Sequence, residues 1–348
     1  MLFLIMLCTF LKNLLAVSEN CRNFALDRSR RRFSSARNVA YQGGPFFVYR
    51  VMEYTKQLLT LQQQIDVLKK RGLQIDNEAE AKDMLDTISY FRLAGYWRLM
   101  EADKVRHIFK PGSKFSQIIS LYHFDEELRL LLFSSIQQIE VAVRARMIRL
   151  FTERHGAFWF MDSTLAGSST LFTSNLQSLQ DELHRSEDEY ILEHFRKYDS
   201  PAMPPVWKTM EVASMGTLSK LYSNMSDNAA KKAVSRSFMV PKFEYMRNWL
   251  RCITVVRNIC AHHARLWNVN IVVKPNIPNY LPNPWIINSQ INRDKLYPHL
   301  CYIAYWLNAI NPTNTFTKDI KTLLAKYPVV DPAAMGCPRG WKDEPLWQ

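Results

Sequence analysis

The chain has 348 residues, of which 47% are hydrophobic and 12% are aromatic. These values exclude an intrinsically disordered protein and predict one large folded domain or two smaller ones. The formal net charge of +13 favours a negatively charged partner, either a nucleic acid or an anionic surface.

Residues 1–51 differ from the rest of the chain. Residues 1–17 are apolar, but Lys12 interrupts them, and the run is too short to span a bilayer comfortably. No basic stretch precedes this apolar run, whereas a signal peptide has one there. Residues 1–51 carry eight Lys or Arg residues and two acidic residues. The sequence that begins at Met52 resembles an ordinary protein N-terminus. We expect residues 1–51 to be upstream sequence or a disordered extension, with a weak membrane anchor as the alternative.

Apolar residues that recur every three or four positions predict a mostly helical protein. Thr60 and Gln63 form a capping-box pattern before a helix that ends at Gly72, and Asn77 caps a second helix over 78–100, which Gly95 would interrupt. The strongest helical pattern covers 120–152. A loop is expected over 161–174.

The second half of the chain predicts six more helices, over 176–192, 207–225, 228–238, 243–264, 296–310 and 318–327. Residues 331–348 are rich in Pro and Trp and are expected to form a tail. The predicted fold class is therefore all-α, with one helical domain over 52–330. No two of the six cysteines have zinc-ribbon spacing, so reduced thiols in a cytoplasmic protein are expected.

The segment "VVRNICAHHARLWN" (255–268) places several proton-handling groups in an apolar helical run. At 100° per residue, Asn258, His262 and Arg265 share one polar face, with Arg257 beside them, whereas His263 falls on the apolar face. A solvated helix face is the ordinary interpretation of such a cluster. Cys260, His262 and His263 point apart on a helix, and no distant ligand set accompanies them, so neither a metal nor a cofactor is expected.

Cleavage of an RNA backbone is the chemistry that these side chains suit. A base must take the proton of the ribose 2′-OH, an acid must protonate the leaving 5′-oxygen, and a cation must stabilise the phosphate charge. Histidine suits the proton transfers because its pKa is near neutrality, and arginine binds phosphate oxygens with two donors. One His cannot easily be both acid and base, so a homodimer with a composite site is expected.

Five segments together resemble a known family: "LTLQQQIDVLKKRGL", "ISYFRLAGYWRLM", "YHFDEELRLLLFSSIQQIEVAVRARM", "PPVWKTMEVASMGTLSKLY" and "RNICAHHARLWN". In this order they are similar to the abortive-infection AbiD/AbiF-like family of bacterial phage-defence proteins. The resemblance covers roughly residues 53–330. Arg257-Asn258, followed after three residues by His262, also resembles the signature of the HEPN ribonuclease superfamily. The resemblance implies a HEPN-like helical bundle, a target RNA, and catalytic roles for Arg257 and His262, helped by Asn258.

Further residues have two interpretations each. Tyr90, Arg92, Tyr96 and Trp97 could form an RNA-binding platform of aromatic and basic side chains, or the end of a core helix. Glu140 and Arg144 could be a simple pair on one helix, or one of them could reach and orient the helix of Arg257.

The functional alternative to an endoribonuclease is a non-catalytic RNA-binding or phage-sensing module of an abortive-infection system, which could hold a small noncoding RNA. Neither function requires stable membrane association.

Overall fold

The computed structural model describes residues 57–348, and it confirms that the fold is mostly helical. This part of the chain contains twelve α-helices, α2 to α13, and one antiparallel pair of short strands. The predicted N-terminal extension, 1–51, lies outside the described residues. No helix among the described residues is both long enough and apolar enough to cross a membrane.

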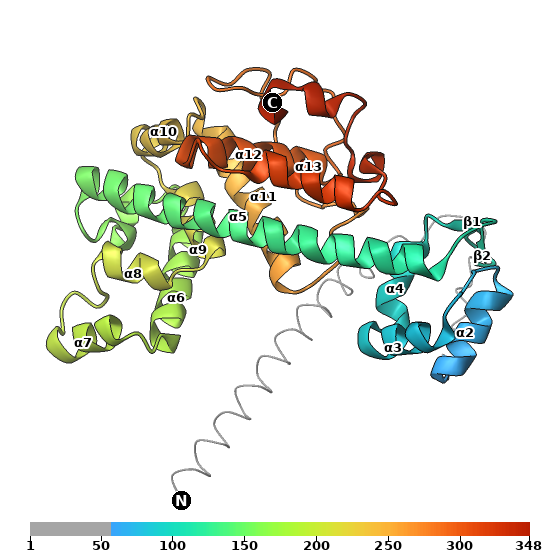
Figure 1. Ribbon diagram of the computed structural model, residues 1–348. Helices are drawn as coiled ribbons and strands as arrows, with labels where there is room; N and C mark the ends of the chain where they lie inside the picture. Colours follow the sequence, from blue (N-terminus) through green and yellow to red (C-terminus); the bar gives the residue numbers. More distant parts are fainter. Residues whose placement is uncertain (1–56) are drawn as a thin grey trace, which may run out of the picture. The chain divides into compact units, whose positions relative to one another are not determined.

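The longest helix, α5 (Phe115–His155), is the element around which most of the others pack. It contacts α4, α8 and α9 as well as α10, α11, α12 and α13, and Figure 1 shows it crossing the middle of the bundle. Its buried side chains recur every three or four residues over its whole length: Ile118, Leu121, Phe124, Leu128, Leu132, Ile136, Ile139, Val143, Met147 and Phe151.

Three short helices and the strand pair lie at the N-terminal end of α5 (Figure 1). Helix α2 (Leu61–Lys70) begins with the predicted capping box of Thr60 and Gln63. The predicted helix over 78–100 is instead two helices, α3 (Glu78–Ile88) and α4 (Tyr90–Trp97). The break falls at Ser89, with φ 76°, and not at Gly95, because the Ser89 side chain caps the start of α4. Strands β1 (Glu101–Asp103) and β2 (Ile108–Phe109) follow.

The middle of the chain forms five helices, and serine caps set the starts of two of them, α6 and α9. The predicted loop over 161–174 is shorter than expected, because Ser168 caps α6 (Ser169–Arg185), which begins before residue 176. Helix α7 (Glu189–Lys197) follows. The predicted helix 207–225 is divided into α8 (Val206–Val212) and α9 (Met215–Asn224), since Ser214 caps a new start. Helix α10 (Asn228–Ser237) agrees closely with its prediction.

The C-terminal part supplies the helix that carries the candidate site. Helix α11 (Phe243–Ala261) packs on α5 and α9. Helix α12 (Tyr297–Ile310) is buried on nearly all sides, and α13 (Phe316–Lys326) packs on α5. Residues 331–348, expected to be a tail, contribute buried Trp341, Leu346 and Trp347 to the core, and the Trp347 ring stacks on that of Tyr297.

Candidate functional site

Glu140 of α5 joins the two helices that form the candidate site. Its Oε1 atom lies 3.3 Å from Nη2 of Arg144, one turn along α5, and its Oε2 atom lies 4.0 Å from Nε of Arg257 on α11. Arg144 also donates a 3.0 Å hydrogen bond to the carbonyl oxygen of Ala213. Glu140 and Arg144 are an i,i+4 pair, and Glu140 also reaches Arg257. A role of Glu140 in orienting the helix of Arg257 remains a prediction.

Asn258 and His262 lie on the exposed side of α11, whereas Arg257 turns toward α5. His262 is the C-cap of the helix, and its backbone N–H donates to the carbonyl oxygen of Asn258 at 3.0 Å. Five residues along a helix amount to about 140° of rotation. Within residues 57–348, no hydrogen bond joins the side chains of Arg257 and His262. One chain therefore presents the Arg and the His in different directions.

The structure corrects the predicted positions of His263 and Arg265. The helix was expected to continue to residue 264, which would place His263 against the core, but α11 ends at Ala261. His263 has φ 53° and is exposed, because the chain turns away from the helix there. His262 and Arg265 therefore do not share one face of a helix. Its guanidinium donates to the carbonyl oxygen of Gly95 in α4.

Helix α4 contacts this turn with side chains that the sequence analysis considered for RNA binding. The Arg92 guanidinium donates a 2.6 Å hydrogen bond to the carbonyl oxygen of His263. Tyr96 and Trp97 are almost completely buried, so they cannot stack on RNA bases, and the interpretation as a core helix end is the right one for both. Tyr90 is half-buried, and its hydroxyl accepts a hydrogen bond from Arg71 at 2.8 Å.

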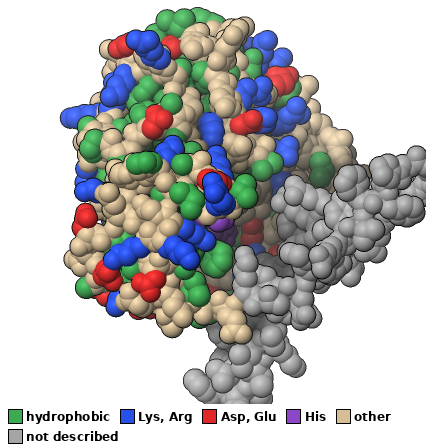
Figure 2. All heavy atoms as spheres, turned by 90° about the vertical axis from the view of Figure 1, so that its right-hand side faces the viewer, with side chains coloured by type: hydrophobic (Ala, Val, Ile, Leu, Met, Phe, Trp, Pro, Cys, Tyr) green, Lys and Arg blue, Asp and Glu red, His purple; other side chains and the backbone are tan. Residues whose placement is uncertain are grey.

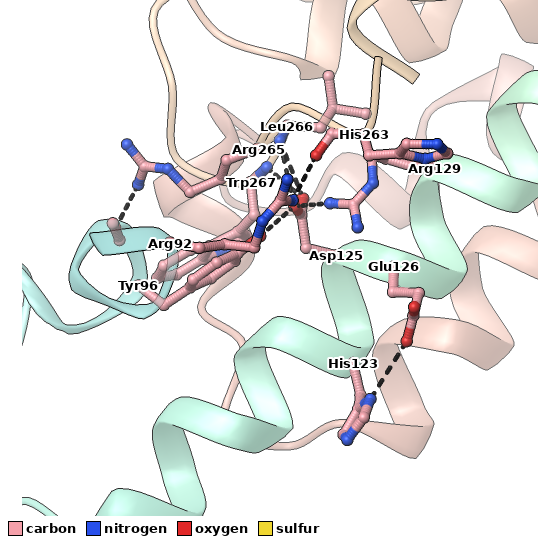
Figure 3. Close-up of polar contacts among 11 residues, drawn as sticks. Arg92, Tyr96, His123, Asp125, Glu126, Arg129, His263, Arg265, Leu266 and Trp267 are labelled. Atoms are coloured by element: carbon pink, nitrogen blue, oxygen red, sulfur yellow. Dashed lines mark hydrogen bonds and ion pairs between the residues drawn. The ribbon is translucent and has the colours of Figure 1, made fainter. Parts of the chain in front are cut away.

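Asp125, which the sequence analysis did not single out, holds the segment after His262 in place (Figure 3). Its carboxylate accepts hydrogen bonds from the backbone N–H groups of Leu266 and Trp267 and, at 2.7 Å, from the hydroxyl of Tyr96. It also pairs with Arg129, one turn along α5. Burial raises the pKa of the Asp125 carboxyl, and the charge of Arg129 opposes that rise. The sequence signal that could have identified Asp125 is an acidic residue on the apolar face of a predicted helix, next to Phe124.

The cysteine beside the site is unreactive. Burial raises the pKa of the Cys260 thiol to about 12, so the thiol stays protonated near neutral pH and is a poor nucleophile or metal ligand. The described residues contain no group of three or more His, Cys, Asp or Glu side chains placed to hold a metal ion. Cys252, Cys260, Cys301 and Cys337 are free thiols.

Basic side chains are widespread on the surface. Figure 2 shows one face of the molecule, on which Lys and Arg side chains occur more widely than Asp and Glu side chains. The sequence has 45 Lys and Arg residues against 32 Asp and Glu residues. Such an excess gives a positive field that attracts polyanions.

Residues 57–348 thus form a mostly helical protein with an Arg, Asn and His cluster at the end of α11. Residues 83–268 match the family described as Abi-like protein, so the chain belongs to that family. The match includes α4, α5 and the whole of α11, and it ends directly after the segment held by Asp125. Neither the curated proteins nor the solved structures contain a match to this chain.

Proposed function

We propose that this protein acts in abortive-infection phage defence as a metal-independent endoribonuclease. Membership of the Abi-like family supports the role in phage defence. The contact between Glu140 and Arg257 carries the proposal for the chemistry, since it holds a phosphate-binding cation on the helix that also presents Asn258 and His262. The similarity of this cluster to the HEPN ribonuclease signature agrees with that assignment.

The proposed reaction uses side chains of α11 and of its C-cap residue, His262. The His262 imidazole takes the proton of the ribose 2′-OH, and the 2′-oxygen attacks the adjacent phosphorus. The 5′-oxygen leaves with a proton donated by the His262 imidazole of a second copy of the chain, which gives 2′,3′-cyclic phosphate and 5′-OH ends. Arg257 stabilises the negative charge on the phosphate, and Asn258 orients the imidazole or a phosphate oxygen.

A homodimer would complete this site. One imidazole cannot easily serve as base and acid in the same step, and Arg257 and His262 of one chain point in different directions. A second copy of the chain would add a second His262 by symmetry. The proposed partners are therefore RNA, of the cell or of the phage, and another copy of the same protein.

The deciding experiment compares the wild-type protein with His262→Ala, both purified and both expressed in cells challenged with phage. We expect the wild type to protect the cells and to produce RNA fragments with 2′,3′-cyclic phosphate ends, and the folded variant to do neither. A wild-type protein that binds RNA but cuts none, even during phage challenge, would rule out the nuclease.

A non-catalytic RNA-binding module is the second candidate function. It is favoured by the exposed position of the His262 ring, which no side chain orients by a hydrogen bond within residues 57–348. In that case Arg257→Ala weakens RNA binding, His262→Ala changes it little, and both the wild type and His262→Ala protect cells from phage. A small noncoding RNA would be a suitable ligand for such a module.

A further inference from the structure

The cavity between α5 and α11 is large enough for a nucleotide. Its volume is about 300 Å³, and binding sites for small ligands are commonly about 300–1,000 Å³. Six described residues form its lining: Phe133, Gln137, Glu140, Val141, Arg144 and Arg257. Five of them belong to α5, so one rigid helix provides most of the surface.

The charge of the lining favours an anion. Two guanidinium groups share one carboxylate, that of Glu140. Arg144 is mostly buried and is also engaged by the Ala213 carbonyl oxygen. Arg257 is more exposed, at 36% of its side-chain surface, and its contact with Glu140 is the longer one. Arg257 is therefore the cation that can receive a phosphate without breaking a close ion pair.

The rest of the lining includes aromatic and apolar side chains. Phe133 and Val141 lie eight residues apart on the same face of α5, and their exposed fractions are 38% and 55%. The guanidinium carbon of Arg257 lies 5.8 Å from the centroid of the Phe133 ring, so an aromatic surface and a cation face the same space. Gln137, one turn after Phe133, adds an amide donor and an amide acceptor.

We propose that this cavity binds one unpaired RNA nucleotide next to the cleaved linkage. The base stacks on Phe133, the Gln137 amide contacts the base edge, and Arg257 binds the phosphate. This inference rests on the proposed function. Arg257 belongs both to the cavity lining and to the proposed catalytic cluster, so a nucleotide bound in the cavity adjoins the phosphate that Arg257 binds. The subsite requires single-stranded RNA, since a paired base cannot enter, and it gives cleavage a base preference.

Photocrosslinking and affinity measurements on the full-length protein test the subsite. The probe is a short single-stranded RNA with one 5-iodouridine, used with His262→Ala so that the RNA stays intact. We expect a crosslink in the peptide that contains Phe133. Phe133→Leu should weaken binding by about 5- to 100-fold because stacking is lost, whereas Phe133→Tyr, which keeps a ring, should retain it. Leu130→Ala is the matched control, because Leu130 is exposed on α5 and is not among the lining residues.

The outcomes separate this inference from the proposed function. If RNA binds with equal affinity to the Leu and Tyr variants, or crosslinks to another peptide, the subsite is wrong and the nuclease proposal stands. Equal affinity for a double-stranded RNA of the same sequence would also overturn the subsite. If the wild-type protein binds no RNA at all, both proposals fail. If wild type cuts RNA, the Phe133→Leu and Gln137→Leu variants should also change the base found beside the cleaved bond.

Discussion

Arg92 donates a 2.6 Å hydrogen bond to the carbonyl oxygen of His263, across 171 positions of sequence. The bond joins α4 to the turn at the end of α11. Arg265 makes a second connection in the opposite direction, to the carbonyl oxygen of Gly95. A Cβ atom added to Gly95 would lie 3.0 Å from Nε of Arg265, so a larger residue there would require the Arg265 side chain to shift by a few tenths of an ångström. Helix α4 thus acts as a clamp on the segment that follows His262.

Arg92→Ala should loosen that segment without unfolding the protein. Arg92 is exposed, and one hydrogen bond from a charged donor contributes about 1.5–3 kcal/mol at most. We expect faster amide hydrogen exchange in a peptide covering residues 262–267, measured by mass spectrometry, with little change elsewhere. Arg98→Ala is the control, since Arg98 is an exposed arginine at the end of α4. Equal exchange in both variants would mean that the clamp does not restrain the turn.

Asp125→Asn should destabilise the whole domain. The substitution removes the charge that faces Arg129, and it leaves a buried guanidinium without its carboxylate. Breaking a buried ion pair by removing one partner costs about 3–5 kcal/mol. Urea unfolding should show this loss as a lower midpoint with an unchanged slope. Glu126→Gln, at the adjacent exposed position, should change stability by less than about 1 kcal/mol. Similar midpoints for the two variants would contradict the role of Asp125 as the central acceptor.

Much of the fold was predictable because local signals set it. The capping box at Thr60, the apolar period of α5 and the start of α10 are all properties of short segments. The extra helix breaks at Ser89 and Ser214 were missed, although serine is a preferred N-cap residue. In both cases the apolar period continues across the break, and periodicity alone predicts one longer helix.

The candidate site was only partly predictable, because tertiary contacts determine its end. Glu140 and Arg257 could be named from sequence, since each lies on a strongly periodic helix. The exposure of His263 could not, because a helical wheel assumes that the helix continues, and the bonds from Arg92 and to Asp125 are distant in sequence. The burial of Tyr96 follows from the same contacts, since its hydroxyl bonds to Asp125.

Glu140→Gln should separate RNA binding from RNA cleavage. Removing the carboxylate makes the cavity more positive, so RNA affinity should stay the same or increase. Arg257 loses its partner and its fixed position, and misplacing a catalytic group by about 1 Å can lower a rate about 100-fold. We therefore expect a decrease in cleavage of about 10- to 100-fold at saturating RNA. Glu153→Gln, which removes an exposed i,i+4 partner of Arg149 on α5, serves as the control. A variant that loses binding and cleavage in parallel would show that Glu140 only supports the fold.

His299 should make the stability of the domain sensitive to acid. It is completely buried in α12, and burial lowers its pKa to about 3, against about 6.5 when it is exposed in the unfolded chain. Below pH 6.5 the unfolded chain therefore binds a proton that the folded protein does not. The contribution of His299 to stability is complete above pH 6.5 and is lost progressively as the pH falls toward 3.

His299→Gln should remove this part of the pH dependence. Between pH 7 and pH 5, the free energy of unfolding of the wild type should fall by about 2 kcal/mol more than that of the variant, as a difference of 1.5 pH units predicts. Urea unfolding at the two pH values gives the comparison. A small packing defect caused by the substitution lowers the free energy of unfolding at both pH values and does not change the difference between them. His184→Gln, at an exposed position of α6, should keep the wild-type dependence. If His299→Gln loses as much stability as the wild type on acidification, the imidazole takes up its proton without unfolding, and it must then have access to solvent that the packing of α12 does not provide.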